Sequence, residues 1–290
     1  LKYTNDYEFI HNEIYPSLVK IIEAYSNKID VDGNNIFLDE DGLLSAGTEN
    51  TQITWMDVKI DNHAITPRNG KTVELNALWY NALKIAEELT ELYGTKEQEK
   101  KYNELAEKCK KSFKEKFYNK RRKCLYDVIT DEKNKDGKIR PNQLFALSLT
   151  HPIVEPNSIE ANNIINVVEK KLLNNYGLKT LAKGEPNYVD IYEGDAFKRD
   201  MSYHQGITWT WLLELYYEAL KNADGSSQAI IFTGMPSSDV KAIYKKRLVN
   251  TTVFMIIITL MACALLAVVI TFIVKAITKV IGHLDEVADG

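Results

Sequence analysis

Apolar side chains recur every three to four positions through most of the first 220 residues. Between residues 73 and 93, for example, they fall at Leu75, Leu78, Ala82 and Leu89. A period close to 3.6 residues predicts amphipathic helices. We expect six such helices, over residues 7–25, 73–93, 97–117, 141–149, 158–174 and 203–220.

Long polar loops separate these helices. Short extended segments are expected at residues 35–38 and 124–129. The loops over residues 119–140 and 180–203 exceed the usual length of a connection, and loops of that kind often carry function. Antiparallel helices with functional loops at one end are typical of a helical toroid. The sequence therefore predicts an all-α toroid over residues 1–224.

The pattern changes after residue 224. Residues 229–234 are apolar and β-like, residues 237–247 begin a polar helix, and the 27 residues 248–274 carry no charge. About 20 apolar residues are enough to cross a bilayer, whereas a buried core helix rarely stays uncharged for so long. We therefore expect a junction with a short strand over residues 225–247, a single transmembrane helix over 248–274 and a linker over 275–290.

The net charge of −4 is unevenly distributed. Residues 229–290 hold six basic and four acidic side chains, so residues 1–228 hold 30 basic and 36 acidic ones. Because phosphate binding needs clustered Lys and Arg, the acidic body argues against a nucleic-acid partner. Four basic residues precede the apolar run and two follow it, which favours a cytoplasmic body. The absence of an apolar signal segment at the start of the sequence agrees with that expectation.

The cysteines and histidines indicate no metal site. Cys109, Cys124 and Cys263 follow neither a metal-ligand spacing nor the even count of a disulfide framework. His204 also lacks a second His or Cys at ligand spacing, so we interpret it as a hydrogen-bonding side chain. We expect no metal and no cofactor, and the cysteines fit a reducing compartment.

Residues 53–83 are the most informative stretch for function, because they combine Trp55, Trp79 and several carboxylates. Flat rings can stack on sugar carbons, and acids can protonate a glycosidic oxygen. Asp57 follows Trp55 and Met56, so we expect its carboxyl to be partly desolvated and able to stay protonated as a general acid. The plainer alternatives are a helix cap or structural aspartate for Asp57 and a core position for Trp79.

Further polar candidates stand in the same stretch and in residues 177–211. Arg68 lies in a Pro-Arg-Asn-Gly loop, where it either orients a carboxylate or hydroxyl group or belongs to a surface turn. The later segment gathers Asp200, His204 and Gln205 at one loop-to-helix entry.

Four blocks of sequence resemble, in this order, the glucosidase domain of glycogen debranching enzymes over residues 1–222. They are TWMDVKIDNHAITPRNGKTVELNALWYNAL, IRPNQLFALSL, GLKTLA and YHQGITWTWLL. The resemblance implies an (α/α)6 toroid that hydrolyses α-1,6-linked glucose stubs with inversion. It also implies glycogen or α-glucan oligosaccharides as partners.

The resemblance assigns expected roles to individual residues. Asp57 falls in the block that supplies the family's proposed general acid. The pocket-lining blocks contain Trp55, Arg68, Glu74, Asn76, Trp79, Arg140, Asn142, Gln143, Asp200, His204, Gln205 and Trp209.

Inversion also needs a second carboxylate as base, about 6.5–9.5 Å from the acid with a water between them. The family's base is expected in a Ser-Glu segment after the YHQG block, and no such segment follows Leu220. Asp195, Asp200 and Glu214 are the nearby late acids. We therefore expect an incomplete toroid with weak or absent hydrolysis.

Residues 229–290 resemble a methyl-accepting chemotaxis receptor instead. AIIFTGMPSSDV is similar to the last strand of a Cache-type sensor domain, and KAITKVIGHLDEVADG to the start of a HAMP linker. A receptor would place the toroid outside the cell, so the orientation stays open. The alternatives to an enzyme are a membrane-anchored carbohydrate-binding sensor and a fusion artefact, with a lipid bilayer as partner through residues 248–274.

Overall fold

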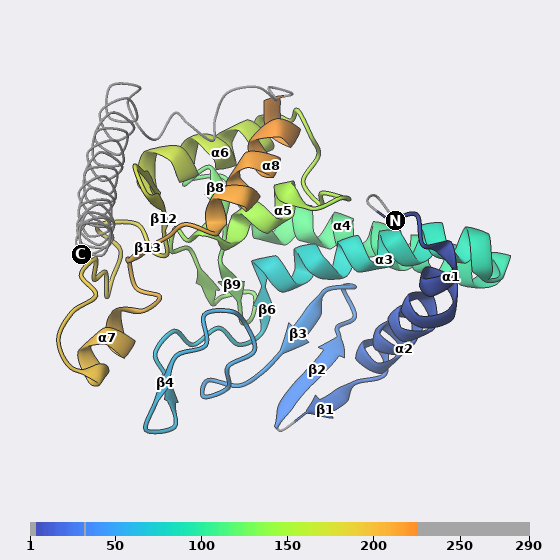
Figure 1. Ribbon diagram of the computed structural model, residues 1–290, viewed down its shortest axis with the longest axis horizontal. Helices are drawn as coiled ribbons and strands as arrows, with labels where there is room; N and C mark the ends of the chain where they lie inside the picture. Colours follow the sequence, from blue (N-terminus) through green and yellow to red (C-terminus); the bar gives the residue numbers. More distant parts are fainter. Residues whose placement is uncertain (1–3, 32, 225–290) are drawn as a thin grey trace, which may run out of the picture. The chain divides into compact units, whose positions relative to one another are not determined.

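The computed structural model describes residues 4–31 and 33–224, and helices dominate the regular structure of that part of the chain (Figure 1). The helices are α1 (Tyr7–Phe9), η1 (Ile10–Ile14), α2 (Tyr15–Ser26), α3 (Val73–Tyr93), α4 (Lys96–Phe117), η2 (Pro141–Leu144), α5 (Phe145–Ser148), α6 (Ile159–Lys171), α7 (Ala196–Ser202) and α8 (Leu212–Asp224). The helices predicted over residues 7–25, 73–93 and 97–117 are confirmed to within one residue at each end.

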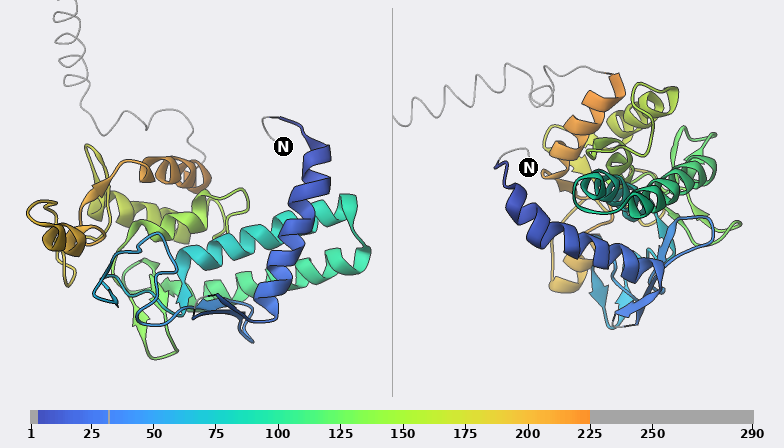
Figure 2. Two further views of the ribbon diagram at one scale, coloured as in Figure 1. Left: turned by 60° about the horizontal axis from the view of Figure 1, so that its bottom comes forward. Right: turned by 90° about the vertical axis from the view of Figure 1, so that its right-hand side faces the viewer.

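α3 and α4 lie antiparallel and side by side (Figures 1 and 2). α3 ends at Gly94, as the sequence predicts, and Thr95 and Gln98 form a capping box that starts α4. The buried side chains of α4 recur every three or four residues, at Tyr102, Ala106, Cys109 and Phe113. They belong to one core shared with α3.

A second group of helices packs around α5, with α8 against both α5 and α6 (Figure 2). Ser158 caps α6 as predicted, since its side chain accepts a hydrogen bond from the Ala161 N–H at 3.1 Å. Leu147, Ile164 and Ala219 are fully buried and belong to the same core as α3 and α4. One core therefore continues beneath both groups of helices.

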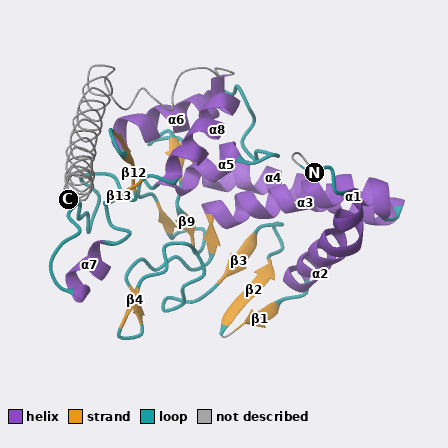
Figure 3. Cartoon of the chain, viewed as in Figure 1, coloured by secondary structure: helices purple, strands orange, loops and turns teal. Residues whose placement is uncertain are grey.

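Short antiparallel strands form within the long segments between the helices (Figure 3). In the described residues, three-stranded sheets have the orders β1-β2-β3, β10-β9-β6 and β11-β12-β13, and β4-β5 and β7-β8 are two-stranded. The strands are β1 (Ile29–Val31), β2 (Asn34–Leu38), β3 (Leu44–Ala46), β4 (Lys59–Ile60), β5 (His63–Ala64), β6 (Lys71–Thr72), β7 (Tyr118–Asn119), β8 (Cys124–Leu125), β9 (Val128–Ile129), β10 (Lys135–Asp136), β11 (Leu173–Asn174), β12 (Gly177–Lys179) and β13 (Thr208–Trp209). The helical part of the all-α prediction is therefore observed, but these residues also form several small sheets that an all-α fold does not include. Most of these strands are too short to show an alternating pattern, and they form because loop backbone must find hydrogen-bond partners.

The helix predicted over residues 203–220 is wrong in its first half. Between α7 and α8 the chain turns and forms β13. Gly206 has φ +145°, and a Cβ there would lie 2.6 Å from the Val189 carbonyl oxygen. Its N–H donates to Thr180 Oγ1 at 2.9 Å. Close contact with two other loops therefore replaces the helix that the Trp and Leu spacing predicts.

The predicted junction over residues 225–247, transmembrane helix over 248–274 and linker over 275–290 lie outside the described residues. Within residues 4–31 and 33–224, no helix is both long enough and apolar enough to cross a bilayer. The long antiparallel helices expected of a toroid are observed. The incomplete toroid over residues 1–224 itself stays a prediction.

Candidate active site

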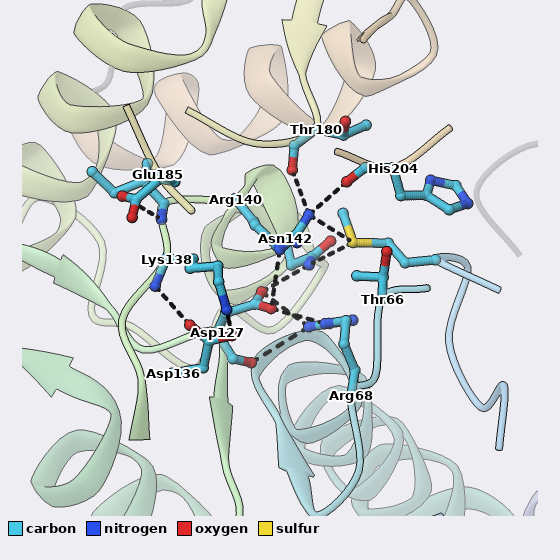
Figure 4. A network of polar contacts seen from close by, with 12 residues as sticks. Thr66, Arg68, Asp127, Asp136, Lys138, Arg140, Asn142, Thr180, Glu185 and His204 are labelled. Atoms are coloured by element: carbon cyan, nitrogen blue, oxygen red, sulfur yellow. Dashed lines mark hydrogen bonds and ion pairs between the residues drawn. The ribbon is translucent and has the colours of Figure 1, made fainter. Parts of the chain in front are cut away.

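Arg68 belongs to a buried network of charges (Figure 4). It is only 3% exposed, so it is not part of a surface turn. Its Nη2 donates to Glu74 Oε2 at 2.6 Å and its Nε donates to Asp127 Oδ2 at 2.8 Å. Burial alone would lower the pKa of Arg68, but the charges of Asp127 and Glu74 outweigh burial and raise that pKa above its usual value.

Arg140 approaches the same carboxylate of Asp127, with its Nε 3.7 Å from Oδ2. Its Nη1 donates to the His204 carbonyl oxygen at 2.6 Å, and its Nη2 donates to Gln205 Oε1 at 3.0 Å. Burial lowers the pKa of Arg140, while the Asp127 charge opposes that shift. Two arginines thus face two carboxylates, Glu74 and Asp127, and the four charges balance in the interior.

The network anchors the loop that carries Trp55 and Asp57. Trp55 Nε1 donates to Asn142 Oδ1 at 2.8 Å, and Asn142 Nδ2 donates to Asp127 Oδ1 at 2.8 Å. Met56 is 3% exposed, and its sulfur lies 3.7 Å from Arg140 Nη1. The two residues before Asp57 are therefore tied to the charged interior, which fixes where the carboxyl group stands.

Asp57 lies at the surface beside a buried histidine. Its side chain is 64% exposed, so the desolvation expected from the sequence is not observed. Its Oδ1 lies 3.6 Å from Nε2 of His204, whose side chain is 2% exposed. Neither ring nitrogen of His204 has a hydrogen-bond partner among the described residues. Burial lowers the pKa of His204 to about 4, although Asp57 opposes the shift, so the imidazole is neutral at pH 7.

His204 is the middle of a row of aromatic rings. Its ring centroid lies 5.1 Å from that of Trp55 and 4.9 Å from that of Tyr203, both edge-on, and 6.0 Å from the nearly parallel Trp209. The row continues from Trp55 to Trp211 at 5.0 Å and from Tyr203 to Tyr192 at 5.7 Å. We call the set Tyr192, Tyr203, Trp209, His204, Trp55 and Trp211 the aromatic row.

An exposed carboxylate beside such rings suits a sugar ligand, and comparison with known proteins decides the family. The chain matches the family described as Amylo-alpha-1,6-glucosidase over residues 1–252. It belongs to that family. The match confirms the resemblance to glycogen debranching enzymes. It also runs beyond residue 222, where the resemblance was expected to end, through the predicted junction and into the first residues of the predicted transmembrane helix.

Two similar proteins show how this amylo-α-1,6-glucosidase family member compares with others. The glycogen debranching enzyme of Saccharomyces cerevisiae (strain ATCC 204508 / S288c) is 25% identical over 218 residues, which cover 61% of this chain and 14% of the yeast protein. The chain therefore spans a small part of that relative's length. The crystal structure of a GH78 family rhamnosidase of Bacillus sp. GL1 aligns with a TM-score of 0.44 and 14% identity, covering 72% of this chain and 17% of that one.

The structure brings most of the predicted residues of this family member together. One group consists of the exposed Asp57 carboxylate and the rings of His204, Trp55 and Trp209. The buried network joins Arg68, Glu74, Arg140, Asn142 and Gln205. The second group supports the first from the interior, because Arg140 binds the His204 backbone and Asn142 binds the Trp55 indole.

Three predicted pocket residues make other contacts. Asn76 Oδ1 accepts from the Leu44 N–H at 2.8 Å, and Asn76 Nδ2 donates to the Leu44 carbonyl oxygen at 3.0 Å. Gln143 Nε2 donates to the Arg140 carbonyl oxygen at 2.9 Å. Asn76 and Gln143 thus hold backbone segments, and Asp200 lies half-buried on α7.

Trp79 occupies the interior. It is 3% exposed, and its ring centroid lies 6.4 Å from that of Tyr25. With Leu44 and Leu75 it lines an apolar cavity of about 280 Å³. This is the core position that the sequence left open as the alternative to a sugar-stacking role.

Asp127 is the residue of the buried network that the sequence analysis missed. It is 3% exposed and contacts Arg68, Arg140 and Asn142. The available signal was local, because Asp127 is the charged residue within the apolar segment 124–129. A buried carboxylate needs partners, so its position in that segment predicts a cation nearby.

The described part of the chain also bears on metals and thiols. Cys109 and Cys124 are buried and free, and burial raises the pKa of both thiols. Among residues 4–31 and 33–224, no group of three or more His, Cys, Asp or Glu side chains is placed to hold a metal ion.

Proposed function

We propose that this chain hydrolyses α-1,6-linked glucosyl units of α-glucans such as glycogen limit dextrin, with Asp57 as the general acid. The observation that supports this most directly is the exposed Asp57 carboxylate beside the aromatic row, in a member of the Amylo-alpha-1,6-glucosidase family. The printed name of the yeast relative, a glycogen debranching enzyme, supports glycogen as the source of the substrate.

In this proposal, Asp57 donates its proton to the glycosidic oxygen as the bond from that oxygen to the anomeric carbon breaks. A water adds to the anomeric carbon and gives its proton to a base. When a second carboxylate activates the water on the opposite face of the sugar, the configuration inverts. General acid catalysis of this kind contributes typically about 100- to 10,000-fold to the rate.

The buried network supports the role of Asp57 by holding its neighbours still. Trp55 is bound through Asn142 to Asp127, and Asp127 is bound to Arg68. Catalytic groups must be held to within about 0.5 Å of their productive positions, and residues locked by packing and hydrogen bonds achieve this. The interior charges therefore position the acid without touching the sugar.

Substitution of Asp57 tests the proposal. Asp57→Asn keeps the size of the side chain but removes the acid, so glucose release from limit dextrin should fall by about 100-fold or more. Asp61→Asn is the matched control, because Asp61 is an exposed aspartate four positions away, in the turn between β4 and β5. Asp61 has φ +46°, a conformation that Asn tolerates well. Wild-type rates in Asp57→Asn would refute the assignment.

The finer expectations for the rest of the chain gain no support from the comparisons. Neither the family match nor the yeast relative supports impaired hydrolysis, a receptor-like tail or a carbohydrate sensor. A bilayer partner through residues 248–274 and a cytoplasmic body stay predictions. Carbonate extraction of the full chain from membranes would test the first, and protease protection would test the second.

A further inference from the structure

The aromatic row has two solvent-exposed ends. Tyr192 is 48% exposed and Trp211 is 42% exposed. Each end leads through one further ring to His204, in steps between 4.9 and 5.7 Å from centroid to centroid. The Asp57 carboxylate approaches the row at His204, which is the middle ring in the order of contacts from Tyr192 to Trp211.

The two ends come from different elements of the fold. Tyr192 belongs to the long loop before α7, and Trp211 immediately precedes α8 (Figure 1). Aromatic side chains bury about 150–250 Å² each when they are covered, and they dominate the energetics of many interfaces. Two half-exposed rings, each joined through one further ring to His204, therefore offer binding surface at both ends of the aromatic row.

We propose that Tyr192 and Trp211 bind the main chain of a branched α-glucan on the two sides of its branch point. In such a glucan, the α-1,6 bond leaves a chain of α-1,4-linked glucose that continues in two directions. A carboxylate at the middle ring of a row with two exposed ends matches that branching. Asp57 meets the branch bond, and pyranose faces stack on the outer rings. The inference rests on the proposed function, because the branch bond is what brings the glucan to Asp57.

The proposal separates polymeric from short substrates. A disaccharide with one α-1,6 bond, such as isomaltose, reaches Asp57 and the central rings alone. Limit dextrin carries main chain on both sides of the branch and reaches Tyr192 and Trp211 as well. Removal of either outer ring should therefore weaken binding of the branched polymer and spare the disaccharide.

Affinity electrophoresis in native gels containing limit dextrin measures this without turnover. Tyr192→Ala and Trp211→Ala should each weaken retention by about 2- to 10-fold, the range expected for loss of one stacked ring. The matched control is Tyr176→Ala, because Tyr176 is 71% exposed between β11 and β12 and outside the aromatic row. The KM for limit dextrin should rise in parallel, while the KM for isomaltose should not change. Unchanged melting curves check that the variants fold.

Several outcomes would overturn the proposal. Retention of both variants equal to that of Tyr176→Ala would show that the outer rings do not bind glucan. An equal loss of affinity for isomaltose would show a general disturbance of the site. Retention by linear amylose that is as strong, and as sensitive to both substitutions, would show that the branch point plays no part. Failure of the proposed function is distinguishable, because a wild-type chain that releases no glucose can still show or lack the ring-dependent retention.

Discussion

A buried histidine whose ring nitrogens lack hydrogen-bond partners is costly, because an unsatisfied polar group in the interior costs about 1–3 kcal/mol. His204 has that environment in the described structure, and its Nε2 lies 3.6 Å from Asp57 Oδ1. Its neutral ring contributes aromatic surface while still presenting a donor and an acceptor. At the scale of single residues, this position links stability to pH.

Stability should therefore fall in acid through His204. Burial lowers its pKa from 6.5 to about 4 in the folded protein, so the unfolded chain takes up a proton first as the pH falls. The stability that the protein gains from keeping His204 neutral is fully present above about pH 6.5. It is lost progressively towards pH 4, and the loss is at most about 3 kcal/mol. The free energy of unfolding, measured with urea between pH 4 and 7, should change less with pH in His204→Asn than in the exposed control His63→Asn. Identical changes with pH in the two variants would contradict the prediction.

Arg68 should be the most costly single charge to remove. Arg68→Met leaves Glu74 and Asp127 without their main cation, at sites no more than 3% exposed. Removal of one partner of a buried ion pair costs about 3–5 kcal/mol, because the remaining charge is uncompensated. The same substitution at the exposed Arg121 should change the free energy of unfolding by less than about 0.5 kcal/mol. Similar unfolding midpoints in guanidinium chloride for the two variants would count against the network.

At the scale of elements, the sequence predicts what is local and misses what depends on distant partners. The 21-residue α3 follows from its apolar period and from Gly94, and α6 follows from Ser158. Residues 203–211 directly precede the Leu-rich α8 and were predicted as part of the same helix, but their conformation is set by contacts with Thr180 and Val189. Such contacts leave no periodic signal, so the break between α7 and α8 could not be read from the pattern.

Gly206 should be intolerant of a side chain for this reason. Gly206→Ala introduces a Cβ 2.6 Å from the Val189 carbonyl oxygen, in addition to strain at φ +145°. Gly184→Ala is the matched control, since Gly184 has φ +92° and nothing within 4 Å of the added atom. Backbone strain costs about 1–3 kcal/mol in either variant. Because only Gly206→Ala also adds a steric clash, it should lower the melting temperature more than Gly184→Ala does. It should also reduce glucose release, because Gly206 follows His204 and Gln205 directly. Equal melting temperatures would show that the loop adapts.

At the scale of the whole molecule, the candidate site is assembled from segments far apart in sequence. Arg68 and Asp127 are 59 positions apart, and Arg140 and Gln205 are 65 apart. The resemblance identified the sequence blocks that supply the candidate site, because each motif residue can be matched to the family by its own position in the sequence. It could not show that Arg68 and Asn142 both bind Asp127, or that Arg140 binds Gln205, since those contacts exist only once the chain has folded. Asp127, which contacts Arg68, Arg140 and Asn142, was missed although its place in the apolar segment 124–129 is a local signal.

Trp79 is expected to contribute to stability and Trp55 to sugar binding, and substitution of each should separate these two effects. Trp79 lines a cavity of about 280 Å³ and is 3% exposed, so Trp79→Ala enlarges a void and should cost about 3–5 kcal/mol. Trp55 is half-buried, and its ring meets both His204 and Trp211 edge-on. Trp55→Ala should therefore weaken maltooligosaccharide binding. Calorimetric titration below the melting range should give a wild-type dissociation constant for Trp79→Ala and a raised one for Trp55→Ala. If Trp79→Ala instead binds sugar weakly while melting normally, Trp79 belongs to the sugar site and the division is wrong.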